Sequence, residues 1–189
     1  MGALPKEERS FTYADYKEWE LDEGERYELI HGEAFAMSGP NTQHQAILMA
    51  ISTSFYNYFQ GKPCKVFPAP YDVRLFYEED ESDDTVVQPD IMVICDKSKI
   101  GPEGCRGAPD LIIEILSPSN TAIEMERKFK LYRRAGVQEY WVVDPENKGL
   151  TAYCFKDREI LTKIYGSADT VSVATFPDLS LNLEQVFAE

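Results

Sequence analysis

The sequence predicts an α/β fold in which helices flank a mixed β-sheet, within a single domain spanning residues 1–189. Two strongly apolar segments, Ile91–Cys95 and Leu111–Leu116, are typical of central strands covered on both faces. Apolar residues recur at helical spacing in Thr42–Gln60 and Thr121–Ala135. Because helices separate some strands while hairpins join others, the pattern favours a mixed sheet.

The other elements follow from local signals. Thr12–Glu20 is predicted as a short helix capped by Thr12, and the first long helix should end near Gly61. The remaining strands are predicted at Cys64–Pro68, Tyr71–Phe76 and Glu139–Val143. An N-terminal hairpin is predicted from Arg26–His31 and Glu33–Met37, and a C-terminal hairpin from Leu150–Phe155 and Ile160–Ile164. The tail Leu181–Phe187 should contain a helical turn. These two hairpins are expected as additions to the central sheet.

The composition is that of a globular protein, since 43% of the residues are apolar and 12% aromatic. The net charge of −14 argues against a broad nucleic-acid-binding surface, so any action on nucleic acid would need a local basic patch. Six of the seven residues from Glu78 to Asp84 are acidic, and we interpret them as a solvated loop. No apolar run approaches the roughly 20 residues of a membrane span, and no signal-like stretch opens the chain, so we expect a cytoplasmic protein with no membrane partner.

The cysteines do not form a recognisable metal motif. They stand at positions 64, 95, 105 and 154, without the close spacing of a zinc site. Cys95 and Cys154 lie in apolar strand patterns, which predicts buried thiols at both positions. Nothing in the sequence indicates the oxidising compartment that a disulfide framework requires.

Two carboxylates stand out because of their apolar surroundings. Asp90 follows Pro89 at the start of one central strand, and Glu114 lies inside the other. A carboxylate in such a strand is costly to bury unless it is paired, hydrogen-bonded or bound to metal. At neighbouring strand ends the two would suit Mg²⁺ or Mn²⁺, which prefer oxygen ligands. The alternative is that Asp90 caps a turn and Glu114 forms a structural salt bridge.

The helix after Glu114 places a lysine on its apolar side. On a helical wheel, Lys128 and Glu124 fall within the arc of the apolar residues, and a lysine facing a sheet is seldom there for solubility. Lys128 would then lie near the carboxylates, or it pairs with Glu124 at i,i+4 along the edge of the core. The other basic residues of this helix form a positive patch that either contacts a nucleic-acid backbone or is simply solvated; they are Arg127, Lys130, Arg133 and Arg134.

Three further residues are weaker candidates. Asp110 shares a strand face with Glu114 but would lie roughly 13 Å away along an extended strand, too far to share one ion, so we expect it to start the strand. Glu28 is flanked by Tyr27 and Leu29 in the N-terminal hairpin, and strand alternation alone could place it in solvent. His44, at a helix start, either contacts a phosphate or caps a turn.

Several short motifs occur together along the chain: Arg26–Glu33, His44–Gln45, Ala69–Leu75, Val87–Ile91, Gly107–Ser119, Lys128–Tyr132 and Glu139–Pro145. Together they resemble the Uma-type putative restriction endonuclease family over nearly the whole chain. That family is placed in the PD-(D/E)XK nuclease superfamily, so the resemblance implies a restriction-endonuclease-like fold and a Mg²⁺- or Mn²⁺-dependent endonuclease that acts on DNA. Homodimers are common among nucleases that cut both strands.

The resemblance also implies roles for individual residues. Asp90 matches the aspartate of the first half-motif and Glu114 the acidic residue of the second, with the backbone carbonyl of Ile115 as a third metal ligand. Leu116 stands where the superfamily usually has lysine, which makes Lys128 the candidate for a relocated lysine. Glu124 corresponds to an acidic residue that the family usually has four positions before the helix lysine. The superfamily often adds a carboxylate from an early element, and the resemblance makes Glu28 the candidate for that role. The competing hypothesis is an inactive nuclease-like fold that serves as a binding or assembly module and holds no metal.

Overall fold

A computed structural model describes residues 10–20, 22, 25–157 and 159–188. Its largest sheet is six-stranded and mixed, in the order β11-β10-β9-β8-β6-β3, with β8 and β9 parallel and the other neighbours antiparallel. The strands are β3 (Lys65–Pro68), β6 (Ile91–Ile94), β8 (Leu111–Ile115), β9 (Glu139–Asp144), β10 (Gly149–Lys156) and β11 (Glu159–Tyr165). The mixed sheet predicted from the sequence is therefore present.

The N-terminal part of the chain contributes a second mixed sheet. Its order is β2-β1-β5-β4-β7, and the strands are β1 (Tyr27–Ile30), β2 (Glu33–Ala36), β4 (Val73–Arg74), β5 (Val86–Val87) and β7 (Cys105–Arg106). A two-stranded sheet pairs β12 (Thr170–Ser172) with β13 (Ser180–Asn182). The two predicted hairpins, β1–β2 and β10–β11, are thus integral parts of the larger sheets rather than additions to one.

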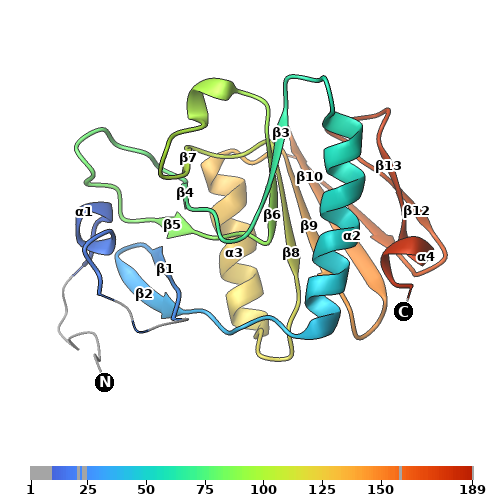
Figure 1. The fold of residues 1–189 in the computed structure, drawn as a ribbon, viewed down its shortest axis with the longest axis horizontal. Helices are drawn as coiled ribbons and strands as arrows, with labels where there is room; N and C mark the ends of the chain where they lie inside the picture. The colour runs from blue at the N-terminus through green and yellow to red at the C-terminus, as the bar shows by residue number, and fades with distance from the viewer. Residues whose placement is uncertain (1–9, 21, 23–24, 158, 189) are drawn as a thin grey trace.

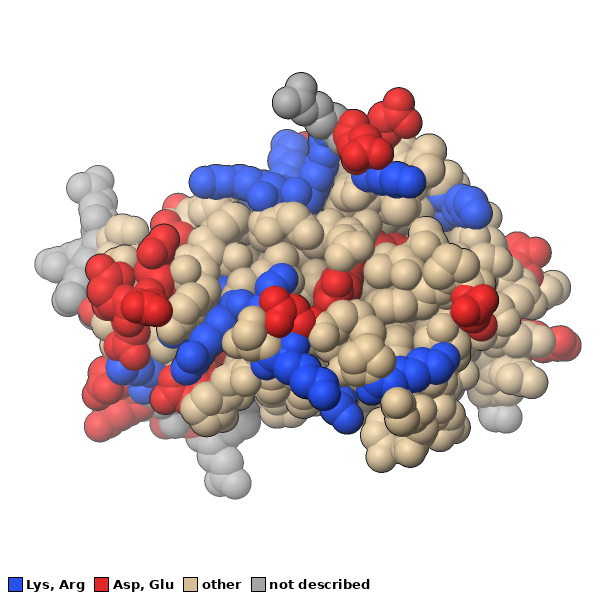
Figure 2. All heavy atoms as spheres, turned by 90° about the horizontal axis from the view of Figure 1, so that it is seen from above, with Lys and Arg blue, Asp and Glu red and all other residues tan. Residues whose placement is uncertain are grey.

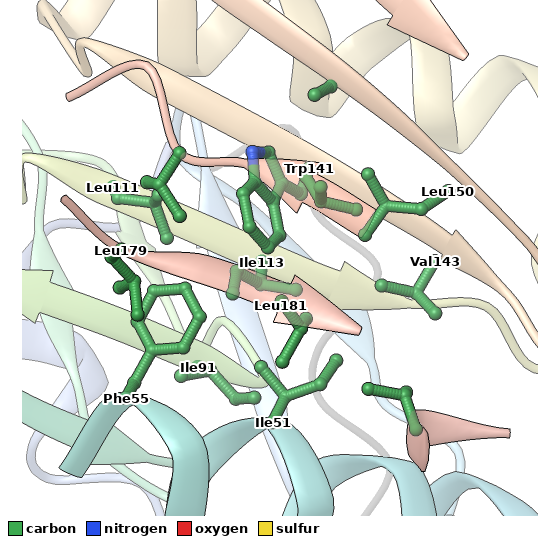
Figure 3. Close-up of a cluster of buried hydrophobic side chains, with 14 of the residues drawn as sticks. Ile51, Phe55, Ile91, Leu111, Ile113, Trp141, Val143, Leu150, Leu179 and Leu181 are labelled. Atoms are coloured by element: carbon green, nitrogen blue, oxygen red, sulfur yellow. The ribbon is translucent and has the colours of Figure 1, made fainter. Parts of the chain in front are cut away.

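Two long helices cover opposite faces of the six-stranded sheet (Figure 1). On one face, α2 (Thr42–Phe59) packs on odd-numbered strand residues such as Ile91, Ile113 and Trp141, the cluster drawn in Figure 3. On the other, α3 (Ala122–Ala135) packs on even-numbered residues such as Met92 and Ile112. Alternation of side chains along a strand explains why β6 and β8 are apolar throughout.

The remaining helices are short. They are α1 (Tyr13–Tyr16), the 3₁₀ turn η1 (Lys97–Lys99) and α4 (Leu183–Val186). Thr12 is the N-cap residue of α1, as predicted, and its amide and hydroxyl both donate to Asp15 Oδ2 at 3.0 Å. Gly136 ends α3 with a φ of 91°, a left-handed conformation that suits glycine. No described helix combines the length and apolarity needed to cross a lipid bilayer.

The cysteine predictions were wrong at Cys95. Cys64 and Cys95 form a disulfide that links the ends of β3 and β6. The antiparallel register, which pairs Lys65 with Ile94, places the next residues outward opposite each other, although 31 positions separate them in sequence. Cys154 is only half-buried on β10.

Negative charge is concentrated on one side of the molecule. Figure 2 shows the molecule from above relative to Figure 1, and acidic side chains gather at the left of this view. In Figure 1 the same side contains α1 and the chain between β4 and β5. That chain contains the predicted acidic loop, which is solvated only in part. Asp83 is 4% exposed and forms a buried ion pair with Arg74, whose guanidinium also lies 3.8 Å from the Tyr13 ring centroid.

Asp83→Ala is expected to lower the free energy of unfolding by about 3 kcal/mol, because it leaves the Arg74 guanidinium buried without its counter-charge. Glu79→Ala, in the exposed part of the same loop, is the matched control and should change stability by less than about 0.5 kcal/mol. Urea unfolding of both variants measures the difference. Equal midpoints for the two would show that the pair does not hold this loop.

Candidate active site

Asp90 and Glu114 lie opposite each other on adjacent antiparallel strands. The register of β6 and β8 pairs Ile91 with Ile113, and its continuation by one residue aligns Asp90 with Glu114. Directly opposed residues place their Cβ atoms about 5 Å apart on the same face of the sheet, here the face that α3 covers. The Ile115 amide donates to Asp90 Oδ2 at 2.7 Å and fixes the aspartate at the strand end.

Lys128 extends from α3 into this pair. Its Nζ lies 3.0 Å from Glu114 Oε1 and 3.1 Å from Glu28 Oε1 on β1, and all three side chains are at most 10% exposed. The Tyr132 hydroxyl, one turn later on α3, donates to Glu114 Oε1 at 2.6 Å. The backbone amide of Gln88 donates to Glu28 Oε1 at 3.0 Å. Residues from β1, β8 and α3 therefore meet at one ammonium group.

His44 extends from the first turn of α2 toward Asp90. Asn41 caps α2 by accepting a hydrogen bond from the His44 amide at 2.8 Å, which leaves the imidazole free for another role. Its Nε2 lies 3.1 Å from Asp90 Oδ2. Nδ1 is buried and has no hydrogen-bond partner among the described residues. The cap is therefore formed by Asn41, and His44 orients Asp90.

These side chains line a cleft of about 640 Å³. It lies between the β1–β2 hairpin, the first turn of α2, and the chain from Ser117 into the first turns of α3. The first turns of both long helices lie at the lower end in Figure 1, away from the end that Figure 2 shows. Six of the sequence candidates contribute to its lining together with Ile115; they are Glu28, His44, Asp90, Glu114, Glu124 and Lys128.

The cluster carries more negative than positive charge. Burial raises the pKa of Glu114 to about 7; Lys128 opposes this rise, and the carboxylates of Asp90 and Glu28 add to it. Burial alone would lower the pKa of Lys128, but Glu114 and Glu28 outweigh it and raise that pKa well above its ordinary value. The ammonium therefore stays charged, and when Glu114 is ionised the three carboxylates and one ammonium of the cluster carry a formal charge of −2.

The residues present fit a divalent cation with few protein ligands. Within the described ranges, the partners of Asp90 use only Oδ2 and those of Glu114 only Oε1, which leaves Oδ1 and Oε2 available. No three histidine, cysteine or acidic side chains of the described residues are arranged as a metal cluster. Mg²⁺ commonly binds through one or two carboxylates and keeps several waters, so two carboxylates suit it better than they suit an ion that needs a full protein cage.

We expect Mn²⁺ binding to weaken about tenfold for each pH unit below 7, because the metal must displace the proton that Glu114 holds there. Above about pH 7 the affinity should level off. Calorimetric titration across this range measures the dependence. Glu126→Gln, on the exposed side of α3, is the control and should keep the profile, whereas Glu114→Gln should bind weakly and without this dependence. An unchanged profile in Glu114→Gln would contradict the assignment.

The same shift predicts how stability depends on pH in chelator. A carboxyl group whose folded pKa lies above its unfolded value of 4.5 contributes stability below that value, and the contribution is lost as pH rises through about 7. We therefore expect the difference in free energy of unfolding between Glu114→Gln and wild type to favour the variant more at about pH 8 than at about pH 5. Thermal unfolding at both pH values measures it, and a gain that is larger at the lower pH would reverse the predicted sign.

These contacts also bear on other sequence predictions. Of the two alternatives for Glu124, the pair with Lys128 is not formed, because Glu124 accepts a hydrogen bond from Asn120 Nδ2 at 2.9 Å. Asp110 starts β8 at its other end, as expected, and accepts from the Cys95 amide at 2.7 Å. Of the predicted basic patch, Arg127 is half-buried and lines the cleft, with its guanidinium 4.1 Å from the Phe35 ring centroid.

Sequence reasoning missed three contributors to the site. Tyr132 lies four residues after Lys128 on α3, a spacing that places its hydroxyl on the same carboxylate. Gln88 acts through its backbone amide, which no residue pattern identifies. Arg26 lines the cleft from the position just before β1, two residues before Glu28, a spacing that strand alternation could have revealed.

Comparison with known proteins identifies relatives. The family model described as Uma2, "Putative restriction endonuclease", matches residues 13–184. Two proteins of Synechocystis sp. are similar: uncharacterized protein slr1290 is 27% identical over 74% of this chain and 71% of its own length, and uncharacterized protein sll1609 is 29% identical over 70% and 74%. The crystal structure of a "putative nuclease belonging to DUF820" from Anabaena variabilis has a similar fold, with a TM-score of 0.73 and 21% identity over 94% of this chain and 98% of that one.

Proposed function

Because the chain belongs to the Uma2 family of putative restriction endonucleases, we propose that the cleft is the active site of a Mg²⁺- or Mn²⁺-dependent endonuclease that hydrolyses phosphodiester bonds in DNA. The observation that carries the proposal is the convergence of Asp90, Glu114 and Lys128 in one cleft with excess negative charge. A restriction-endonuclease-like assignment of the six-stranded sheet and its two covering helices is part of the same proposal.

Asp90 and Glu114 would hold the metal through the oxygens that their present partners leave available, with the Ile115 carbonyl as a third ligand. A bound Mg²⁺ or Mn²⁺ supplies a water of lowered pKa and offsets charge on the scissile phosphate. In hydrolysis a water oxygen forms the new bond to phosphorus, and the bond from phosphorus to one deoxyribose oxygen breaks. His44 and the Ile115 amide position Asp90, while Tyr132 positions Glu114.

Lys128 takes the place of the superfamily lysine that Leu116 does not provide. An ammonium group has three N–H donors, and among the described residues Lys128 uses two, on Glu28 and Glu114. The third can donate to a phosphate oxygen as negative charge develops there. Glu28 positions the lysine and adds negative charge beside the metal ligands. No covalent intermediate is needed.

Incubation of plasmid and single-stranded DNA with the purified chain tests the proposal. We expect cleavage in Mg²⁺ or Mn²⁺ and none in excess chelator. Absence of cleavage of every DNA form in either metal would overturn the assignment as a nuclease.

A binding or assembly module is the second candidate. It is favoured by Leu116 and by the ion pairs of Lys128, which satisfy both of its carboxylate partners without metal. Calorimetric titration with Mn²⁺ separates the two functions: binding that Glu114→Ala abolishes supports the nuclease, and no binding at this site supports the module. The homodimer expected for an enzyme that cuts both strands stays a prediction, which sedimentation velocity would test.

A further inference from the structure

Arg26 and Arg127 line the same cleft as the carboxylates, and among the described residues neither forms an ion pair with them. Arg26 directly precedes β1, two residues before Glu28 on that strand, and both side chains line the cleft beside the hairpin. Phe35 lies opposite Glu28 in the β1–β2 register, and the Arg127 guanidinium is held 4.1 Å from its ring centroid. Both arginines thus lie on the hairpin side of the cluster, while His44 lies on the other side.

The number of cations in the cleft is small. Its described lining residues include three arginine or lysine side chains, Arg26, Arg127 and Lys128, and Lys128 already contacts two carboxylates. Proteins that grip duplex DNA commonly neutralise six to ten phosphates. A chain of net charge −14 also repels the dense charge of a duplex at long range. The cleft can therefore contact about two phosphates besides the reacting one.

Apolar side chains line the cleft together with these polar groups. They are Ile30, Phe35, Met37, Leu48, Pro70 and Ile123, and Ile123 is 71% exposed at the start of α3. Apolar walls suit the faces of unpaired bases, which a duplex keeps stacked inside. Glu28, Glu114 and Lys128, each at most 8% exposed, lie at the floor, where only a flexible strand reaches without distortion of a stiff duplex.

We propose that the cleft takes single-stranded DNA, or a single-stranded segment within a larger DNA, with Arg26 and Arg127 binding the phosphates that flank the scissile one on the hairpin side. This inference rests on the proposed nuclease function and specifies its substrate. Phe35 positions Arg127 by stacking under its guanidinium. Arg127 thereby has less freedom to lose when it binds a phosphate than an unsupported surface arginine would.

Binding and cleavage of one fluorescent 20-residue oligonucleotide, alone and as a blunt duplex, test the inference. Anisotropy in Ca²⁺ measures binding, and Mn²⁺ starts cleavage. We expect the single strand to bind and be cut at least about tenfold better than the duplex. The binding constant should depend weakly on salt, with a logarithmic slope of about 1.4 for two phosphate contacts.

Arg127→Met should weaken single-strand binding about tenfold, reduce the salt slope by about 0.7, and leave Mn²⁺ affinity unchanged. Arg134→Met is the matched control, since Arg134 also stacks on a phenylalanine of the same chain, Phe76, but lies at the other end of α3 outside the cleft lining. Duplex binding that equals single-strand binding, or equal effects of the two variants, would overturn the inference. Absence of cleavage with the binding preference intact would instead count against the nuclease function alone.

Discussion

Asp90→Asn is expected to reduce DNA cleavage in saturating Mg²⁺ by about 10³-fold, because it removes the anionic oxygen that would bind the metal while keeping the size of the side chain. The asparagine carbonyl can still accept the hydrogen bond from the Ile115 amide, so the end of β6 should keep its position. Thermal unfolding of the variant should therefore stay close to wild type. Initial rates of plasmid nicking at several Mg²⁺ concentrations measure the loss and show whether excess metal restores it.

Asp110→Asn is the matched control for this experiment. Asp110 also follows a proline at a strand start, but its carboxylate accepts hydrogen bonds from the Cys95 amide and the Gln138 side chain at the opposite end of β8. We expect Asp110→Asn to lower stability and to keep wild-type cleavage. The reverse pattern, with cleavage lost in Asp110→Asn and kept in Asp90→Asn, would contradict the assignment of the metal to Asp90 and place it at Asp110 instead.

Lys128→Met is expected to lower kcat by about 10²–10³-fold while Mn²⁺ still binds. Removing the ammonium takes from Glu28 and Glu114 their one cationic partner among the residues that the structure describes, so a divalent cation should bind at least as tightly as in wild type. Without metal, the variant should lose about 3 kcal/mol of stability or more, since the buried carboxylates repel each other. Divalent cations should restore a large part of this loss.

Two measurements separate a catalytic lysine from a purely structural one. Single-turnover cleavage by metal-saturated Lys128→Met reports the chemical step, and calorimetry reports the metal site. A metal-saturated rate within about threefold of wild type would contradict a role for Lys128 at the phosphate. Lys130→Met, on the exposed side of the same helix, is the control, because the Lys130 ammonium pairs with Glu126 alone among the described residues.

The pairing of Asp90 with Glu114 illustrates what the sequence could predict. Both residues were identified because a carboxylate in an apolar strand needs a partner, and the two strands proved to be neighbours. The inward position of Lys128 followed from helical periodicity, which is a local property. Neither argument required knowledge of strand order.

Glu28 and His44 could not be decided from the sequence because both depend on contacts with distant segments. Alternation places Glu28 on one of two faces of β1, and only the packing of α3, 100 residues later, identifies that face as buried. His44 was weighed as a cap, but Asn41 takes that role. The Arg74–Asp83 pair and the Cys64–Cys95 disulfide were missed for the same reason, since each joins segments whose proximity arises from sheet register.

Anomalous diffraction from a crystal of the wild-type chain soaked in Mn²⁺ tests whether Asp90 and Glu114 bind a divalent metal. We expect a peak about 2.0–2.6 Å from one carboxylate oxygen of Asp90 and one of Glu114, with the Lys128 ammonium still in contact with Glu114. The same peak should be absent from crystals of Asp90→Asn. A peak only at Asp110 or in the loop from Glu78 to Asp84, or none within reach of Asp90 and Glu114, would contradict a metal site in this cleft.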